Sequence, residues 1–397
     1  MPESIALYVH FPFCVSICPY CDFDRQATGF NRIDVYLQAV ARELEQYAAT
    51  RDRVHSIFFG GGTPSLMSAQ QVEHVLKAVQ RTFRVLPEAE ITLECNPGDA
   101  DLEKLRAFRA LGANRLSIGV QSLDDTFLKL LGRRHDSTAA RHAADWARQA
   151  GFSFNLDFMF GLPGQSLTHW QTTLDQAVRL APDHLSCYLL TLDERVPMGR
   201  DVAAGRLVLP VDDDLAEMYT ATCRRLGEAG YTQYEISNWA RPGKASRHNL
   251  TYWHDEAWIG VGAGAASSYA GRRWKATPVL ERYIASVERD GRAACVEDES
   301  PDWQTQMLDY LTLGLRLRDG VLLAAFEARF GLELLPLLAE PGAWLLSTGV
   351  LECDGTWLRI AAEHQLITNE ILVRLDPAIR ALPVHGPPPR PLSNAAR

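Results

Sequence analysis

The sequence predicts an α/β fold, in which six parallel strands and their helices form a partial (β/α)6 TIM-like barrel and a smaller, mainly helical domain follows. Strand-like and helix-like segments alternate six times between residues 5 and 190, an order typical of a parallel sheet covered by helices. Glycine and polar residues come just past the ends of successive strand segments. This placement favours a barrel over an open doubly wound sheet, because barrels carry their chemistry at that face.

The first three βα units are predicted from hydrophobic periodicity. Strand patterns cover residues 5–11, 54–59 and 89–95. Apolar residues recur at helical spacing over residues 33–47. Ser68 and Gln71 have the spacing of a capping box, which predicts that a second helix begins there. A third helix is expected over residues 101–111.

The next three units continue the pattern to residue 190. Strands are predicted at residues 115–120, 152–160 and 184–190. Sequence of helical character follows the first of these up to Gly151, and a further helix is expected over residues 166–180. Residues 1–290 are therefore predicted to form the barrel domain with its extension, in which residues 210–290 are mixed and rich in aromatic side chains.

A smaller, mainly helical domain is predicted for residues 298–375, with a short hairpin near residues 351–360. The tail at residues 383–397 holds five prolines, at positions 383, 387, 388, 389 and 391. Because proline interrupts helices, the tail is predicted to be disordered.

Composition and charge exclude several classes of protein. Hydrophobic residues make up 47% and charged residues 22% of the 397 positions, as in ordinary globular proteins. The net charge of −9 argues against a broad nucleic-acid surface, and no nucleic-acid partner is expected. The longest tempting uncharged run, at residues 257–271, is shorter than the roughly 20 residues of a membrane span. The N-terminus carries Glu3 and no basic region, so no signal peptide is expected and a cytoplasmic location is predicted.

Three cysteines, Cys14, Cys18 and Cys21, fall within eight residues directly after the first strand. In a reducing compartment such clustering indicates metal or redox chemistry. A structural zinc site needs four ligands, and the fourth would have to come from His10, Asp22 or elsewhere. A [4Fe–4S] cluster usually takes four cysteines, so that three leave one iron open to bind a ligand. The other cysteines are expected to be buried free thiols: Cys95, Cys187, Cys223, Cys295 and Cys353.

The C-x₃-C-x₂-C loop after a first strand resembles the signature of radical S-adenosylmethionine (SAM) proteins. Seven ordered blocks extend the resemblance over residues 5–375: YVHFPFC, FFGGGTPS, LECNPG, LSIGVQS, LGRRH, NLDFMFGLPGQ and HNLTYW. Together they resemble the oxygen-independent coproporphyrinogen oxidase group, and within it the HemW branch of heme chaperones. The resemblance implies a [4Fe–4S] cluster on the three cysteines, whose open iron chelates the amino and carboxylate groups of SAM.

Several residues past the strands suit SAM binding by their chemistry alone. The glycines of Gly60–Thr63 let the backbone approach an amino or carboxylate group, although such a run is also common in plain tight turns. Glu94 ends the third strand and is suited to ribose hydroxyls or to the sulfonium charge. Arg133, expected in the helix after the fourth strand, is suited to a carboxylate. A second glycine run, Gly260–Gly264, lacks the flanking strand and helix of a phosphate loop.

The resemblance divides the candidate SAM residues into two groups. Tyr8, Gly61 and Glu94 match positions that serve one SAM in the coproporphyrinogen oxidases. Positions that serve a second SAM there are matched by Tyr20, Gly62, Thr63, Gln121, Arg133 and Asp157. Whether this chain binds one SAM or two is left open.

His248 begins the HNLTYW block, which in HemW-like proteins is tied to heme binding. A neutral imidazole can ligate heme iron, and Tyr252 and Trp253 are suited to line an apolar face beside a porphyrin. The alternative is a capping or core histidine.

Two departures from the coproporphyrinogen oxidase pattern bear on function. Phe23 stands where those enzymes carry a further cysteine, and only 13 residues precede Cys14, where they have a long arm. The first hypothesis is therefore a heme chaperone that transfers heme to an acceptor protein, with an electron donor as a further partner. The second is an oxygen-independent coproporphyrinogen III dehydrogenase. The third, a radical SAM tRNA-modifying enzyme, is disfavoured by the net charge and the lack of an added basic domain.

Overall fold

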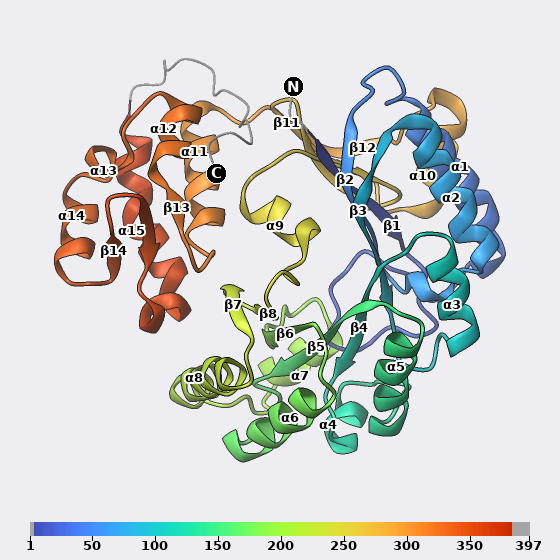
Figure 1. Ribbon diagram of the computed structural model, residues 1–397, viewed down its shortest axis with the longest axis horizontal. Helices are drawn as coiled ribbons and strands as arrows, with labels where there is room; N and C mark the ends of the chain where they lie inside the picture. The colour runs from blue at the N-terminus through green and yellow to red at the C-terminus, as the bar shows by residue number, and fades with distance from the viewer. Residues whose placement is uncertain (1–3, 383–397) are drawn as a thin grey trace.

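Six parallel strands form the centre of the computed structural model, which describes residues 4–382 (Figure 1). The predicted disordered tail at residues 383–397 lies outside the described residues. Each strand pairs in parallel with the next strand along the chain. The strands are β1 (Ile5–Phe11), β2 (Arg53–Gly61), β3 (Arg84–Cys95), β4 (Arg115–Gln121), β5 (Ser153–Phe160) and β6 (His184–Leu189). This arrangement confirms the predicted partial-barrel fold.

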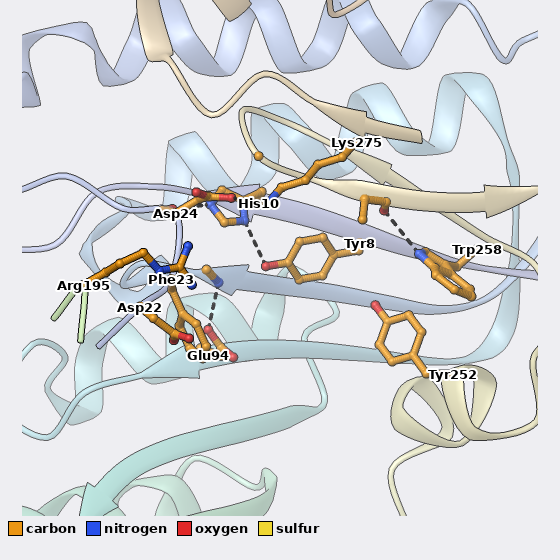
Figure 2. A pocket seen from close by; sticks show the side chains of 13 residues that line it. Tyr8, His10, Asp22, Phe23, Asp24, Glu94, Arg195, Tyr252, Trp258 and Lys275 are labelled. Atoms are coloured by element: carbon orange, nitrogen blue, oxygen red, sulfur yellow. Dashed lines mark hydrogen bonds and ion pairs between the residues drawn. The ribbon is translucent and has the colours of Figure 1, made fainter. Parts of the chain in front are cut away.

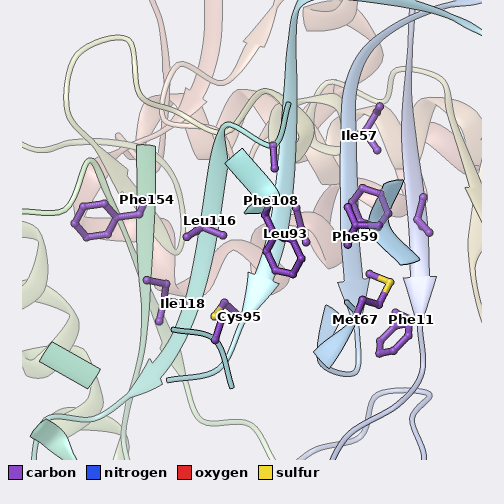
Figure 3. Packing of buried hydrophobic residues seen from close by; sticks show 14 of the residues in the cluster. Phe11, Ile57, Phe59, Met67, Leu93, Cys95, Phe108, Leu116, Ile118 and Phe154 are labelled. Carbon is purple, nitrogen blue, oxygen red and sulfur yellow. The ribbon is translucent and has the colours of Figure 1, made fainter. Parts of the chain in front are cut away.

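Helices cover the outer face of these strands (Figure 1). They are α1 (Ile33–Glu45), α2 (Ala69–Thr82), α3 (Leu102–Ala110), α4 (Asp125–Leu130), α5 (Ser137–Gln149) and α6 (Leu167–Arg179). The capping box predicted at the start of α2 is present, because Ser68 Oγ accepts from Gln71 N and Gln71 Oε1 accepts from Ser68 N. The core between helices and sheet contains Phe59 of β2, Leu93 of β3 and Phe108 of α3, which lie together in Figure 3.

The helical sequence after β4 forms two helices instead of one. Gly132 follows α4 with a left-handed backbone (φ 64°), which an ordinary residue adopts only at a cost, and the chain turns before α5 begins at Ser137. Arg133 therefore lies in the connection between the two helices. Its predicted place inside a helix is wrong, because the glycine stop next to it was not recognised.

Further strands extend the main sheet, which has twelve strands among residues 4–382. On one side β9 (Trp258–Val261) pairs in parallel with β1, followed by β10 (Ala266–Tyr269), β11 (Arg272–Ala276) and β12 (Cys295–Glu299) in antiparallel order. On the other side β8 (Asn238–Ala240) pairs antiparallel with β6, and β7 (Thr232–Glu235) pairs antiparallel with β8 at the edge. The glycine run at 260–264 thus begins inside β9 and is followed by the strand β10 instead of a helix.

Four more helices belong to this part of the chain: α7 (Pro197–Ala203), α8 (Asp212–Glu228), α9 (Arg247–Trp253) and α10 (Leu280–Asp290). The short helix α9 lies on the inner, concave side of the sheet, opposite the outer helices (Figure 1). Its first turn is fixed to β3, since Glu90 Oε1 accepts from His248 N (3.0 Å) and from Ser246 Oγ (3.1 Å). The HNLTYW block therefore points into the barrel.

The C-terminal part has its own hydrophobic cluster, with members from Met307 to Ile379. It contains α11 (Trp303–Gly314), α12 (Leu323–Phe330), α13 (Leu334–Leu337), α14 (Ala339–Ser347) and α15 (Thr368–Arg380), with a small sheet of β13 (Val321–Leu322), β14 (Leu351–Cys353) and β15 (Trp357–Ile360). The strands β14 and β15 form the hairpin expected near residues 351–360. The domain boundaries themselves stay a prediction.

No helix between residues 4 and 382 has both the length and the apolarity that crossing a bilayer requires.

Candidate functional site

The three clustered cysteines lie in the loop that follows β1. Their thiols are free and half-buried. The loop folds back on β1, because Cys14 N donates to Gln26 O (2.9 Å) and Gln26 N donates to Pro12 O (2.7 Å). Burial raises the pKa of Cys14 and Cys21, and neighbouring thiols of the triplet add to the rise. The three sulfur atoms therefore share one small region.

The alternative of a zinc ion finds little support in these residues. His10, the suggested fourth ligand, uses both ring nitrogens: Nδ1 lies 3.0 Å from Tyr8 Oη and Nε2 lies 2.7 Å from the carbonyl oxygen of Asp24. Within residues 4–382 no three His, Cys, Asp or Glu side chains are grouped so that they could hold one metal ion. A [4Fe–4S] cluster binds each cysteine to a different iron, so its ligands need not converge on one point.

Two arginines flank the cysteine loop and suit an anionic iron–sulfur cluster. Arg25 donates from Nη1 to Phe23 O (2.6 Å) and from Nη2 to Cys21 O, and Arg133 donates from Nη1 to Cys18 Sγ (3.5 Å). The Nε atoms of both arginines are buried and have no hydrogen-bond partner among the described residues. Hydrogen bonds and positive charge near the sulfur atoms are among the factors that set the reduction potential of such clusters.

The glycines at the end of β2 allow a close approach between this strand and the cysteine loop. A Cβ on Gly61 (φ 107°) would lie 2.5 Å from His10 Cε1, and one on Gly62 would lie 2.6 Å from Phe13 O. The amide of Gly62 donates to Phe11 O (2.8 Å), and that of Thr63 donates to Phe13 O (2.9 Å). These two amides are therefore occupied by the protein, and the glycines serve packing before they serve any ligand.

Glu94 and Asp157 are two half-buried carboxyl groups inside the barrel. Burial, with the charge of Asp157 as the next cause, raises the pKa of Glu94 to about 8. Burial also raises the pKa of Asp157, which accepts from Ser117 Oγ (3.0 Å) and Asn155 Nδ2 (2.7 Å). The charge of Asp157 disfavours the ionised form of Glu94, and a nearby cation such as the sulfonium of SAM would favour it.

Arg133 brings together part of the second group of candidate SAM residues. Besides Cys18 it contacts Tyr20 Oη (3.4 Å), Gly119 O (2.7 Å) and Asn96 Oδ1. Asn96 in turn donates to Thr63 Oγ1 (3.0 Å). Asn96 was missed in the sequence, although it directly follows the third strand, within the LECNPG block. Gln121 ends β4 with a left-handed backbone (φ 67°), which is uncommon for a residue other than glycine.

His248 lies deep in the barrel and is 2% exposed. Its Nδ1 is 3.0 Å from Ser56 Oγ, its Nε2 is 2.8 Å from Tyr252 Oη, and its ring stacks on Phe58 with 5.0 Å between centroids. Burial lowers the pKa of His248 to about 3, so the imidazole is neutral at pH 7. Both ring nitrogens are engaged in this arrangement, and a bond from His248 to iron requires Tyr252 to move aside.

A pocket of about 610 Å³ opens on the inner side of β1 and β2 (Figure 2). Tyr8, Gly61 and Glu94, the three residues expected at one SAM, all line it, and so does Tyr252 of the HNLTYW block. The other candidate SAM residues and His248 do not. The remaining lining residues are His10, Asp22, Phe23, Asp24, Arg195, Trp258, Gly264, Ala266 and Lys275.

The scattered cysteines serve no common site in this structure. Cys95 and Cys187 are buried, as expected, whereas Cys223 and Cys353 are half-buried. Cys295 is exposed, so its predicted burial is wrong. It begins β12, an edge strand whose residues are all exposed.

A partial barrel of six parallel strands that carries a three-cysteine loop directly after its first strand defines a radical SAM protein. Residues 8–177 match the family model of the radical SAM superfamily, and residues 303–363 match that of the HemN C-terminal domain. Membership in the superfamily implies a [4Fe–4S] cluster and SAM.

Two relatives cover most of the chain. The heme chaperone HemW of Lactococcus lactis is 32% identical over 348 residues, which are 87% of this chain and 90% of the relative. The heme chaperone HemW of Bacillus subtilis is 33% identical over 368 residues, which are 92% and 97% of the two chains. The chain belongs to the HemW family of radical SAM proteins.

The fold is also similar to that of a solved structure, coproporphyrinogen III oxidase (HemN) from Escherichia coli. The TM-score is 0.82 over 94% of this chain and 90% of that chain, at 24% sequence identity. This likeness shows the fold and leaves the activity open.

Proposed function

We propose that the chain is a heme chaperone on a radical SAM scaffold, which binds heme, a [4Fe–4S] cluster and SAM and passes heme to an acceptor protein. One observation carries the proposal: a single pocket joins three candidate SAM residues, Tyr8, Gly61 and Glu94, to Tyr252 of the HNLTYW block. The two relatives compared above carry the name heme chaperone, which supports the same function.

Cys14, Cys18 and Cys21 would hold the cluster. When bound, the cluster supplies an open iron for the amino and carboxylate groups of SAM and a route for electrons from a donor protein. Arg25 and Arg133 offset the negative charge of the cysteine loop. Cysteine ligands of a cluster must stay reduced, and a cytoplasmic location is proposed because that compartment keeps thiols reduced.

Around SAM, this chain's own side chains have separate tasks. Glu94 balances the sulfonium charge from within the barrel, and Tyr8 offers its oxygen as an acceptor, because its hydrogen is directed to His10 Nδ1. If a second SAM binds, Tyr20, Gly62, Thr63, Gln121 and Arg133 would serve it with Asp157.

His248 is proposed as an axial ligand of the heme iron. A neutral imidazole is the form that coordinates iron, and its low pKa keeps His248 neutral. Because Tyr252 lies between His248 and the pocket, the proposed bond requires a rotation of the Tyr252 side chain.

Anaerobic purification followed by addition of hemin (iron(III) protoporphyrin IX) tests the function. The chaperone hypothesis expects a stoichiometric heme complex with a distinct Soret band and transfer of that heme to a heme-free acceptor protein. The competing activity is tested with coproporphyrinogen III, SAM and a reductant. Formation of protoporphyrinogen IX would favour the dehydrogenase and contradict the chaperone proposal.

A further inference from the structure

The pocket is long and has aromatic side chains at both ends. Figure 2 shows Phe23 beside Arg195 at one end, Tyr252 and Trp258 at the other, and Tyr8 between them. These side chains come from the cysteine loop, from α9, from β9 and from β1, so four separate segments supply the aromatic walls of the pocket. Aromatic walls of this kind suit a flat, apolar ligand.

Two cationic side chains also line this pocket. Arg195 follows β6, and Asp193 accepts from its Nε (2.9 Å) and Nη2 (3.0 Å). Lys275 of β11 contacts Asp24 Oδ2 (3.0 Å). The guanidinium has five N–H groups and the ammonium three, so both cations retain donors beyond these partners. The Arg195–Asp193 pair is exposed, and water screens such pairs strongly. A ligand carboxylate can therefore join Arg195 without breaking a strong interaction, whereas at Lys275 it would share a half-buried cation with Asp24.

We propose that Arg195 and Lys275 bind the two propionate carboxylates of a planar tetrapyrrole, whose macrocycle lies along Phe23, Tyr252 and Trp258. This inference rests on the proposed function and names where heme is held and by which groups. SAM does not account for both cations, because it has a single carboxylate, which the open iron of the cluster takes.

Phe23 fits this inference by its position. It is 61% exposed although it is aromatic, and its backbone is fixed by Arg25, which donates to the Phe23 carbonyl oxygen. A macrocycle that covers Phe23 would remove the exposed ring from water.

Hemin and its dimethyl ester, which lacks the carboxylate charges, test the assignment on the cluster-loaded protein. Arg195→Gln and Lys275→Gln should each weaken hemin binding about 3- to 10-fold, as expected for partly exposed charge pairs, and leave ester binding unchanged. Phe23→Leu should weaken both ligands equally. Arg289→Gln and Lys77→Gln are controls, because they remove cations from exposed pairs outside the pocket. Affinities are read from Soret titrations.

The outcomes separate the two proposals. If the wild type binds hemin and both glutamine variants match it, the carboxylate assignment is overturned and the proposed function stands. Equal weakening of hemin and ester in those variants also overturns it, because the cations would then act on the fold of the pocket. If the wild type binds no hemin, the proposed function and this inference fail together.

Discussion

The hydroxyl oxygen of Tyr252 lies 2.8 Å from Nε2 of His248, and Tyr252 lines the pocket while His248 does not. A heme in the pocket would therefore meet the phenol before the imidazole. Tyrosine is itself a known ligand of heme iron. A test of the HNLTYW block must therefore distinguish Tyr252 from His248 as the ligand of the iron.

The first prediction concerns His248. If it is the axial ligand, His248→Ala should shift or abolish the heme spectrum, because the imidazole sets the ligand field. Tyr252→Phe should retain the wild-type spectrum and bind heme at least as well, since it removes the hydroxyl that occupies Nε2. Soret and electron paramagnetic resonance spectra of the ferric complexes measure both effects.

His142→Ala is the control, because His142 is exposed on the outer helix α5. It should keep the wild-type spectrum, and the iron–sulfur absorption should survive in all three variants. An unaltered heme spectrum in His248→Ala would remove the ligand assignment. Loss of the spectrum in Tyr252→Phe instead would identify the phenol as the ligand.

The second prediction concerns the cluster. After anaerobic reconstitution the wild type should hold about four irons and four sulfides per chain. Cys18→Ala should not, because it removes one of only three cysteine ligands. Cys295→Ala removes an exposed thiol on β12 and should match the wild type. Stoichiometric zinc without sulfide in the native protein would contradict the cluster.

Much of the fold was predictable because each βα unit is a local pattern. An apolar strand and the helix face that covers it lie within about 40 residues of sequence, and the capping box of Ser68 and Gln71 is visible in the sequence itself. The stop at Gly132 and the strand Trp258–Val261 were missed, because glycine marks a loop and a strand end equally well.

The candidate site was predictable in part, for the same reason. Cys14, Gly61 and Glu94 lie at the ends of neighbouring parallel strands, which meet at one edge of the sheet. The contacts of His248 are of another kind, because Ser56 is 192 residues away in sequence. Periodicity carries no information on which side chains meet across that separation, and the same holds for Phe23, Trp258 and Lys275 in the pocket.

The third prediction concerns the contact between α9 and the C-terminal part. Arg329 Nη2 lies 2.6 Å from Asp255 Oδ2, and the two side chains are 13% and 6% exposed. Burial raises the pKa of Asp255, and Arg329 counteracts that rise. Arg329→Leu should lower the free energy of unfolding by about 3–5 kcal/mol, because it leaves a buried carboxylate unpaired.

Thermal and denaturant unfolding measure this loss. The double variant Arg329→Leu with Asp255→Asn should recover part of the stability, because no unpaired charge remains. Arg206→Leu, which removes an exposed partner of Asp201, should change stability by less than about 1 kcal/mol. Equal stability of Arg329→Leu and the wild type would show that the buried pair between Arg329 and the turn after α9 does not stabilise the fold.

The last prediction concerns pH and SAM. Because the pKa of Glu94 is raised to about 8, the ligand-free protein keeps this carboxyl protonated at pH 7. A sulfonium favours the carboxylate, so SAM binding should release a proton, and affinity should rise with pH until it levels off above about pH 8. In Glu94→Gln the proton release should vanish and SAM should bind about 10- to 150-fold more weakly.

Stability without SAM should follow the opposite course. The pKa of Glu94 is raised in the folded state. Its contribution to the free energy of unfolding is therefore complete below the unfolded pKa, near 4.5, and is lost as the pH rises through about 8. Glu94→Gln should flatten the decline of the melting temperature across this window, and Asp157→Asn should move it to lower pH, because the charge of Asp157 helps to raise the pKa of Glu94. Glu103→Gln, an exposed change on α3, should do neither.

Calorimetry of SAM binding in two buffers of different ionisation enthalpy counts the released protons, and an equal count in wild type and Glu94→Gln would assign the titration to another group.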